Sequence, residues 1–152
     1  YGHPLSGVLS DLDHFKSIND GAGHASGDDA LRRVASLLTT CIREVDVCAR
    51  YGGDEFALLL PHTPADRAVV VLDRVRTRLA AERASWGGPL SGLTLSMGLA
   101  STENESLTTP DELMALADRA LYSAKRAGRD RMADSRESLG PPPSRPRPPD
   151  SQ

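Results

Sequence analysis

Two pairs of acidic residues stand at points in the chain where strands are predicted to end, and carboxylates at such points can bind metal ions. Asp11 and Asp13 close the first apolar stretch, residues 5–12. Asp54 and Glu55 stand side by side directly before a second apolar stretch. Alternation along a strand sends neighbouring side chains to opposite faces, so the second pair does not form one solvated edge.

A metal site follows if the first strand neighbours the segment that carries the second pair. Carboxylates gathered at one rim of a sheet repel one another unless a cation lies among them. Mg²⁺ and Mn²⁺ bind oxygen ligands, and Mg²⁺ usually brings phosphates as co-ligands. Such a site lowers the pKa of a hydroxyl and stabilises an in-line phosphoryl transfer. The spacing alone is equally consistent with acids solvated at the strand ends.

Polar residues suited to a nucleotide lie near these acids. Lys16 and Asn19 follow the first pair, and Asp28 begins the next predicted helix. Lys125 and Arg129 are four residues apart, so they neighbour each other on a helix surface. Each also has a plain structural interpretation: a turn residue for Asn19, a helix-start acid for Asp28, and a solvated last turn for the two cations.

The elements that position these residues follow from hydrophobic spacing and turn signals, and they predict an α+β fold with a central mixed sheet flanked by helices. Gly52-Gly53 is expected to supply the positive φ of a tight hairpin turn. In chain order the predicted elements are a strand at 5–12, a short helix at 15–19, a helix capped at 26–29 and running to 42, strands at 47–51 and 56–60, a helix with Pro64 at its first position, a strand at 93–100, a helix from a capping box at 109–112 to Gly128, and a strand near 131–133.

Composition narrows the function classes. The net charge of −3 argues against a nucleic-acid binder. No stretch approaches the roughly 20 apolar residues of a membrane span, and no signal peptide is visible, which predicts a cytoplasmic domain. Cys41 and Cys48 fit neither a zinc spacing nor a disulfide framework and are expected to be core thiols.

The ends of the chain differ from its middle. Residues 135–152 hold six of the eleven prolines and one large apolar residue, Leu139, so a disordered tail is expected after a domain at 1–134. A binding motif for a proline-recognising module is the alternative for this tail. The chain opens at Tyr1 rather than at a methionine, which indicates a fragment whose upstream part could carry a sensor or a membrane anchor.

Four segments in the same order resemble the GGDEF family of diguanylate cyclases. These are Asp11-Leu-Asp-His-Phe-Lys-Ser-Ile-Asn-Asp-Gly-Ala-Gly-His-Ala-Ser-Gly-Asp28, Arg50-Tyr-Gly-Gly-Asp-Glu-Phe56, Leu93-Thr-Leu-Ser-Met-Gly-Leu-Ala100 and Tyr122-Ser-Ala-Lys-Arg-Ala-Gly-Arg129. The likeness covers Leu5 to about Met132. It implies a fold similar to nucleotidyl cyclases and the polymerase palm, and a reaction that joins two GTP molecules into cyclic di-3′,5′-guanylate plus two pyrophosphates across a homodimer.

The resemblance also implies roles for individual residues. The metal, Mg²⁺ or Mn²⁺, would be bound by Asp11, Asp54 and the backbone carbonyl of Leu12, and Glu55 would join Asp54 in the catalytic centre. The guanine edge would be read by Asn19 and Asp28. The phosphates would be approached by the backbone of Gly52 and Gly53 and surrounded by Phe15, Lys16, Lys125 and Arg129.

A second, inhibitory site is implied by Arg43-Glu44-Val45-Asp46, which five residues separate from Gly52. On its own, Arg-x-x-Asp is an ordinary exposed helix end. At this distance from the hairpin it matches the family's product-inhibition site, in which Arg43 and Asp46, with Arg74, would bind the product.

Two departures from the family pattern accompany the resemblance. The chain begins too late to include the Asp-x-Leu-Thr segment and the helix that family members carry before the first strand, and Asp130 stands where asparagine is usual. The alternative function is a catalytically silent module that binds GTP or cyclic diguanylate and regulates a partner. Asp11, Asp54 and Glu55 favour the enzyme, because silent receptors commonly lose such acids.

Overall fold

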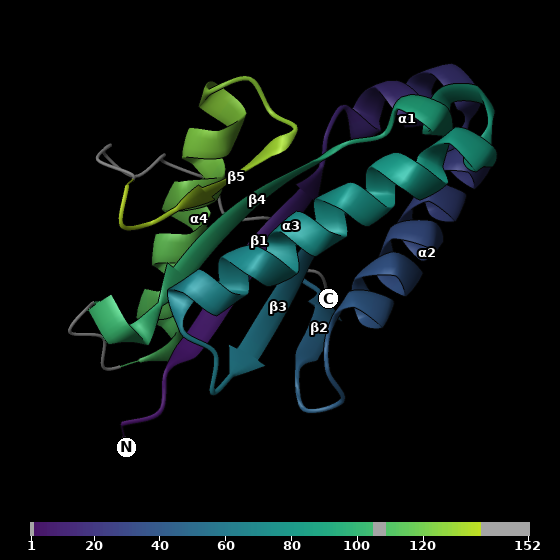
Figure 1. Cartoon of the computed structure of the whole chain (residues 1–152). Helices are drawn as coiled ribbons and strands as arrows, with labels where there is room; N and C mark the ends of the chain where they lie inside the picture. Colours follow the sequence, from purple (N-terminus) through teal and green to yellow (C-terminus); the bar gives the residue numbers. More distant parts are fainter. Residues whose placement is uncertain (1, 105–108, 138–152) are drawn as a thin grey trace, which may run out of the picture.

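The computed structural model describes residues 2–104 and 109–137, which form one sheet with helices on both faces (Figure 1). The elements are β1 (Leu5–Leu12), α1 (Phe15–Ala22), α2 (His24–Cys41), β2 (Val47–Arg50), β3 (Glu55–Pro61), α3 (Ala65–Glu82), β4 (Leu95–Ser101), α4 (Pro110–Arg126) and β5 (Arg131–Asp134), with short 3-10 turns at Arg83–Trp86, Gly88–Gly92 and Thr102–Asn104.

The strand order is β2-β3-β1-β4-β5, so the first strand lies at the centre of a five-stranded sheet. β1 pairs antiparallel with β3 on one side and with β4 on the other, whereas β4 and β5 run parallel. The predicted mixed sheet and α+β class are therefore confirmed. The expected neighbourhood of the first strand and the hairpin, on which convergence of the acids depends, is also present.

Each face of the sheet has its own core. Val8 packs in the larger core with the buried stripes of α2 and α3. Leu9, the next residue along β1, packs in the smaller core against Leu113, Ala117 and Leu121 of α4. Figure 1 shows α3 across one face and α4 on the other. Burial on both faces explains why the middle of β1 is apolar without polar alternation.

Gly98 of β4 lets α4 lie against the sheet at backbone distance. A Cβ at this position would stand 2.1 Å from the carbonyl oxygen of Ala117 and 2.2 Å from the amide nitrogen of Leu121. Only glycine avoids that overlap. Since α4 ends beside the rim that carries Asp11, this contact helps to fix the position of Lys125.

The helix starts agree only in part with the prediction. The predicted N-cap of α4 is confirmed, with the Thr109 hydroxyl accepting from the Glu112 amide at 3.2 Å. The predicted cap at 26–29 is wrong, because Gly23 adopts φ 87° and lets α2 begin at His24, directly after α1. The short helix predicted at 15–19 consequently runs to Ala22.

The first turn of α3 is capped from a distance. Pro64 precedes the helix as its N-cap and not as its first residue, and its side chain offers no acceptor. The carboxylate of Glu103, in the turn after β4, accepts from the Ala65 amide at 2.6 Å. A carboxylate there also complements the helix dipole.

The hairpin between β2 and β3 does not have the turn that its glycines suggest. The glycines with positive φ in the described chain are Gly2, Gly23, Gly87, Gly88 and Gly128, so the expectation for Gly52 and Gly53 is wrong. The turn is instead closed by the amide of Tyr51, which donates to the carbonyl of Glu55 at 2.8 Å. Positive φ is therefore not the reason for glycine at these two positions.

The remaining expectations concern the thiols and the C-terminal end. Cys41 is a buried free thiol, as predicted, whereas Cys48 is only half-buried. The residue after β5, Ser135, donates its amide to Leu99 at 2.8 Å, and Arg136 binds Asp134 and Asp66. The rest of the predicted tail, 138–152, lies outside the described residues. Within the described ranges no helix combines the length and the apolar character of a membrane span.

Candidate active site

A small pocket opens at the rim of the sheet where β1 ends beside the hairpin. Its volume is about 270 Å³. Seven of the residues predicted to bind metal or substrate line it: Asp11, Leu12, Phe15, Lys16, Asp54, Lys125 and Arg129. It is completed by Asp13, His14 and Ser17.

The pairing of β1 with β3 brings the two acidic motifs together. Asp11 stands opposite Glu55 in the register, and the Leu12 amide donates to the carbonyl of Asp54 at 3.2 Å. Residues opposite each other in an antiparallel pair share a face of the sheet. The hairpin therefore brings Asp54 into the rim pocket, whereas Glu55 is not among the residues that line it and its Oε2 would lie 3.1 Å from a Cβ at Gly52.

Burial and neighbouring charges shift the pKa of Asp11 in this pocket. Burial raises the pKa of its carboxyl from 3.8 to about 6, the Lys125 ammonium works against that rise, and Asp54 adds to it. One carboxylate oxygen forms an ion pair with Lys125. The other, Oδ1, is buried without a hydrogen-bond partner in the described structure.

The donor set suits a divalent cation with further ligands from substrate and water. Asp11 and Asp54 supply two carboxylates, and the unpartnered Oδ1 is a free oxygen ligand. Three carboxylates line the pocket, those of Asp11, Asp13 and Asp54, but the described residues contain no group of three or more acidic, histidine or cysteine side chains placed to hold one metal ion. Mg²⁺ needs few protein carboxylates when phosphates complete its shell, so two are sufficient.

Asp13 also lines the pocket, but its carboxylate is bound by other residues of the protein. Its carboxylate accepts from the hydroxyls of Thr94 and Ser96 and from the amide of Asp130. β1 ends at Leu12, so the alternation that would have aligned Asp13 with Asp11 stops one residue too early.

The guanine-reading residues predicted from the sequence are brought together outside this pocket. α1 packs on α2 so closely that a Cβ at Gly27 would lie 1.8 Å from Oδ1 of Asn19 and 3.3 Å from the ring of Phe15. Gly27 therefore makes room for the Asn19 amide directly beside Asp28. Asp28 is exposed and lies in the second turn of α2.

Asp28 lines a separate hollow of about 580 Å³ between α2 and the hairpin, with Leu31, Arg50 and Phe56 among its other walls. The guanidinium of Arg50 donates to the carbonyls of Gly52 and Gly53 at 3.2 and 2.6 Å. It thereby fastens the turn that carries Asp54. This role of Arg50 was not predicted, although its position directly before Tyr51 and the two glycines marks it as a neighbour of the turn.

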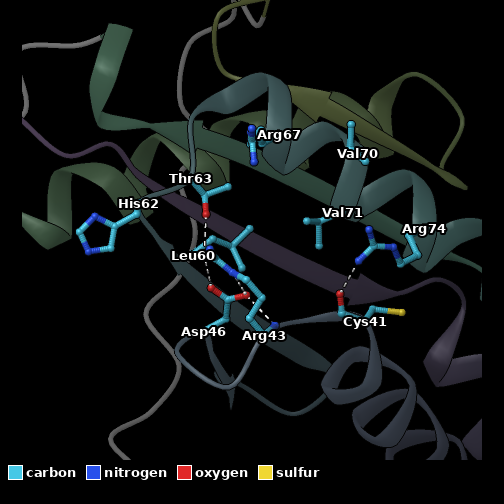
Figure 2. A pocket seen from close by; sticks show the side chains of 10 residues that line it. All are labelled: Cys41, Arg43, Asp46, Leu60, His62, Thr63, Arg67, Val70, Val71 and Arg74. Carbon is cyan, nitrogen blue, oxygen red and sulfur yellow. Dashed lines mark hydrogen bonds and ion pairs between the residues drawn. The ribbon is translucent and has the colours of Figure 1, made fainter.

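A third pocket, of about 450 Å³, contains all three residues predicted for the inhibitory site (Figure 2). Arg43 donates to both oxygens of Asp46, at 2.9 and 3.2 Å, and to Pro61 and Thr63. Arg74 reaches from α3 to the carbonyl of Cys41 at 3.2 Å, as Figure 2 shows.

His62 and Arg67 also line this third pocket and were not anticipated. They lie in the link between β3 and α3 and in the first turn of α3, and nothing in their spacing from Arg43 marks them. Only the fold of the chain brings them to the same surface.

The fold and the site together define an α+β domain that carries a carboxylate pair and phosphate-suited cations at one rim of its sheet. The chain belongs to the GGDEF family: its residues 1–131 match the family described as diguanylate cyclase, GGDEF domain.

The curated relatives agree with this assignment. Diguanylate cyclase A of Treponema denticola is 38% identical over 135 residues, which cover 89% of this chain and 36% of that protein. Diguanylate cyclase DgcM of Escherichia coli is 44% identical over 126 residues, 82% of this chain and 29% of that protein. The chain thus spans about a third of the length of these relatives.

Solved structures share the fold. The GGDEF domain of DgcB from Caulobacter crescentus, in complex with c-di-GMP, has a TM-score of 0.80 at 33% identity, covering 90% of this chain and 80% of that one. The active GGEEF domain of a diguanylate cyclase from Vibrio cholerae gives the same TM-score and identity over 90% of this chain and 85% of its own.

Proposed function

We propose that this domain is a diguanylate cyclase, which joins two GTP molecules into cyclic di-3′,5′-guanylate and releases two pyrophosphates. The observation that carries the proposal is the pocket in which Asp11 and Asp54 stand beside Lys125 and Arg129. Carboxylates for a metal and cations for phosphates are the two needs of phosphoryl transfer. The family and the names of the relatives point to the same reaction.

Asp11 and Asp54, with the backbone carbonyl of Leu12, would hold Mg²⁺ or Mn²⁺, and Glu55 would support the same centre. When bound, the ion lowers the pKa of the attacking hydroxyl and stabilises charge on the reacting phosphate. The buried, unpartnered Oδ1 of Asp11 supports this assignment, since an unsatisfied buried oxygen is costly until it has a partner.

The triphosphate would lie along the cationic wall of the pocket, formed by Lys16, Lys125 and Arg129, with Phe15 beside it. The backbone of Gly52 and Gly53 would approach the same phosphates. A Cβ at Gly53 would meet no atom within 4 Å, so the fold itself does not require glycine there. Close approach of a ligand to the backbone is a physical reason for glycine at such a position.

Asn19 and Asp28 would select guanine. A carboxylate can accept from both the N1–H and the exocyclic amine of the base, and the neighbouring amide can donate to an acceptor on the same ring. Gly27 supports this role because it brings the Asn19 amide next to Asp28.

The reaction needs two copies of the domain. The rim pocket has one carboxylate pair and one cationic wall, which suit a single GTP. The 3′-oxygen of that GTP would attack the α-phosphorus of a GTP held by the facing copy. The new bond between the oxygen and the phosphorus forms as the bond to pyrophosphate breaks and the hydroxyl proton leaves. A second attack in the opposite direction closes the ring.

Product would be bound in the third pocket by Arg43, Asp46 and Arg74, lowering turnover as it accumulates. Three arginines line this pocket against one acid, Asp46, which favours a ligand with phosphates. Product that favours an unproductive arrangement must bind more weakly to the productive one, by reciprocal coupling.

The wider setting is also a proposal. We infer a cytoplasmic domain, because GTP is a cytosolic substrate and both thiols are free. Regulation would come from a sensor upstream of residue 1. The tail expected from residue 135 would begin only beyond Arg136, because Ser135 and Arg136 bind Leu99, Asp134 and Asp66.

The test is to incubate the purified chain with GTP and Mg²⁺ and to quantify cyclic diguanylate and pyrophosphate. The rate per chain should rise with protein concentration, because two copies must meet, and fusion to a dimeric coiled coil should raise it further. No product from the fused dimer would refute the enzyme. GTP binding without turnover would instead support the silent regulatory module.

A further inference from the structure

The carboxylate of Asp13 is buried, with the residue 4% exposed, yet it belongs to no ion pair among the described residues. It accepts from the hydroxyl of Thr94 at 2.7 Å, from that of Ser96 at 2.6 Å and from the backbone amide of Asp130 at 2.9 Å. Its own amide donates to the carbonyl of Thr94 at 3.0 Å. A buried charge is tolerated when hydrogen bonds replace its water in this way.

The Asp130 amide that Asp13 accepts belongs to the turn between α4 and β5. Arg129 and Asp130 both adopt left-handed backbone conformations, with φ 64° and 48°. Two such residues in succession, neither of them glycine, persist only where the surroundings hold them.

Several contacts hold this turn, among them a hydrogen bond from the Arg131 guanidinium to the Arg129 carbonyl at 2.9 Å. The Arg129 amide donates to the carbonyl of Ala124 at 3.0 Å, and the Asp130 amide donates to Asp13. From the other side, the guanidinium of Arg76 donates to the Asp130 carbonyl at 2.7 Å. Asp13 is the one of these partners that lies directly after β1, the strand carrying Asp11.

The side chain of Arg129 lines the rim pocket together with Asp11 and Asp54. In the part of the chain that the structure describes, no hydrogen bond or ion pair restrains its guanidinium. The backbone of the turn therefore fixes the point from which the Arg129 side chain extends, and the contacts of the turn fix that backbone.

We propose that Asp13 is a positioning residue: it ties the Arg129–Asp130 turn to the end of β1, so that Arg129 faces the phosphates of a nucleotide bound at Asp11 and Asp54. This inference rests on the proposed binding of GTP in the rim pocket. Asp13 lines the same pocket, but its carboxylate is engaged by Thr94, Ser96 and the Asp130 amide, so its effect is expected to pass through Arg129.

A double-mutant cycle tests the proposal in the full chain. The variants are Asp13→Asn, Arg129→Ala and the combination of both. The probe is a GTP analogue whose α- and β-phosphates are joined by a methylene group, so that no turnover occurs, and its affinity is measured by calorimetry with Mg²⁺. Each single change should weaken binding of the analogue about tenfold. The double variant should bind the analogue no more weakly than Arg129→Ala alone. In turnover, Asp13→Asn should raise KM more than it lowers kcat.

The control is Asp134→Asn. Asp134 is also buried, at 5% exposed, but it ends β5 and lies outside the rim pocket. The Asp134→Asn change should lower the melting temperature without changing the affinity for the analogue. If Asp13→Asn behaves in the same way, or if its effect simply adds to that of Arg129→Ala, the positioning role is overturned.

Amide hydrogen exchange in the unmodified protein provides evidence that does not depend on a variant folding. The Asp130 amide should be protected, although the Asp130 side chain is 57% exposed. Unprotected exchange would refute the anchor even if GTP binds. Protection of this amide in a protein that does not bind the analogue would refute the proposed function and leave the anchor in place.

Discussion

The rim pocket and the third pocket both combine carboxylates with basic side chains, but they balance their charges in opposite ways. At the rim, burial and, to a smaller extent, the nearby Asp54 raise the pKa of Asp11, and one oxygen of Asp11 has no partner. In the third pocket, Arg43 makes three hydrogen bonds to Asp46, whose side chain is 2% exposed. The rim therefore holds a buried carboxylate oxygen without a partner, whereas the carboxylate of the third pocket has its partners before any ligand arrives.

The difference separates two kinds of site. A site with an unsatisfied buried oxygen gains free energy when a cation enters, so it is suited to chemistry that depends on a metal. A satisfied site can bind a ligand only by exchanging existing hydrogen bonds for new ones, so its affinity is moderate and its occupation reversible. That behaviour suits a regulatory product site.

The largest expected effect comes from removing a carboxylate at the rim. Asp54→Asn keeps the size of the side chain but removes its charge, so turnover should fall by about a thousandfold or more, the equivalent of roughly 4 kcal/mol. The rate of pyrophosphate release measures it. Asp73→Asn, a change to an exposed carboxylate on α3, is the control and should leave the rate unaltered. Retained turnover in Asp54→Asn would remove Asp54 from the metal site.

The second prediction concerns the pH dependence of stability without metal. The folded pKa of Asp11, about 6, lies above the ordinary value of 3.8, so the folded state holds this proton more tightly than the unfolded state. The contribution to stability is present below pH 4 and is lost as the pH rises through 6. The loss amounts to about 3 kcal/mol, from 1.36 kcal/mol per pKa unit.

Urea unfolding between pH 4 and pH 7 in the presence of a chelator measures this loss. Asp11→Asn removes the titrating group, so the variant should become more stable than the unmodified chain above pH 6. Mg²⁺ should restore stability at pH 7 in the unmodified chain and not in the variant. Parallel stability curves for the two proteins across this range would contradict the raised pKa of Asp11 in the folded state.

The third prediction tests the satisfied pocket. Arg43→Ala should weaken product inhibition about ten- to hundredfold, the value of hydrogen bonds to a charged group, and leave the initial rate within twofold. The backbone amide of residue 43 would still donate to Asp46, which preserves the local turn. Progress curves with added product measure the effect.

Arg78→Ala is a matched control for the third prediction. Arg78 lies one turn beyond Arg74 on α3 and binds Thr40 at the end of α2, outside the pocket. Inhibition should be unchanged in this variant. Equal inhibition in Arg43→Ala and Arg78→Ala would mean that the third pocket is not the product site.

The sequence predicted the elements and the family well, because hydrophobic spacing is a local signal. Strand positions, the α4 N-cap and the neighbourhood of β1 and the hairpin were all confirmed. The failures depend on contacts between distant residues. The separation of Asp13 from Asp11 requires the hydroxyls of Thr94 and Ser96, some 80 residues away in the chain.

The glycines of the hairpin show the limit most clearly, since a Gly-Gly pair normally predicts positive φ and here has none. This turn is held by the backbone hydrogen bond from Tyr51 to Glu55 and by Arg50, which donates to the carbonyls of Gly52 and Gly53. Sequence reasoning could mark the turn but could not tell whether glycine serves the fold or a ligand.

The prediction with the smallest expected effect tests whether glycine at position 53 is needed for the fold or for a ligand. A Cβ at Gly53 would meet no atom within 4 Å, and its φ lies outside the left-handed region. Gly53→Ala should therefore leave stability unchanged or raise it by up to about 1 kcal/mol, by restricting the unfolded chain. If phosphates approach the backbone here, the same methyl group should raise KM for GTP about tenfold. Gly92→Ala is the control, because Gly92 also has no neighbour within 4 Å of a Cβ and does not line the rim pocket. This change should affect stability as Gly53→Ala does and leave KM for GTP unchanged. An unchanged KM in Gly53→Ala would mean that this glycine is needed for neither the fold nor the substrate. The phosphates would then be bound by the metal and the cations of the rim pocket, without the backbone at Gly53.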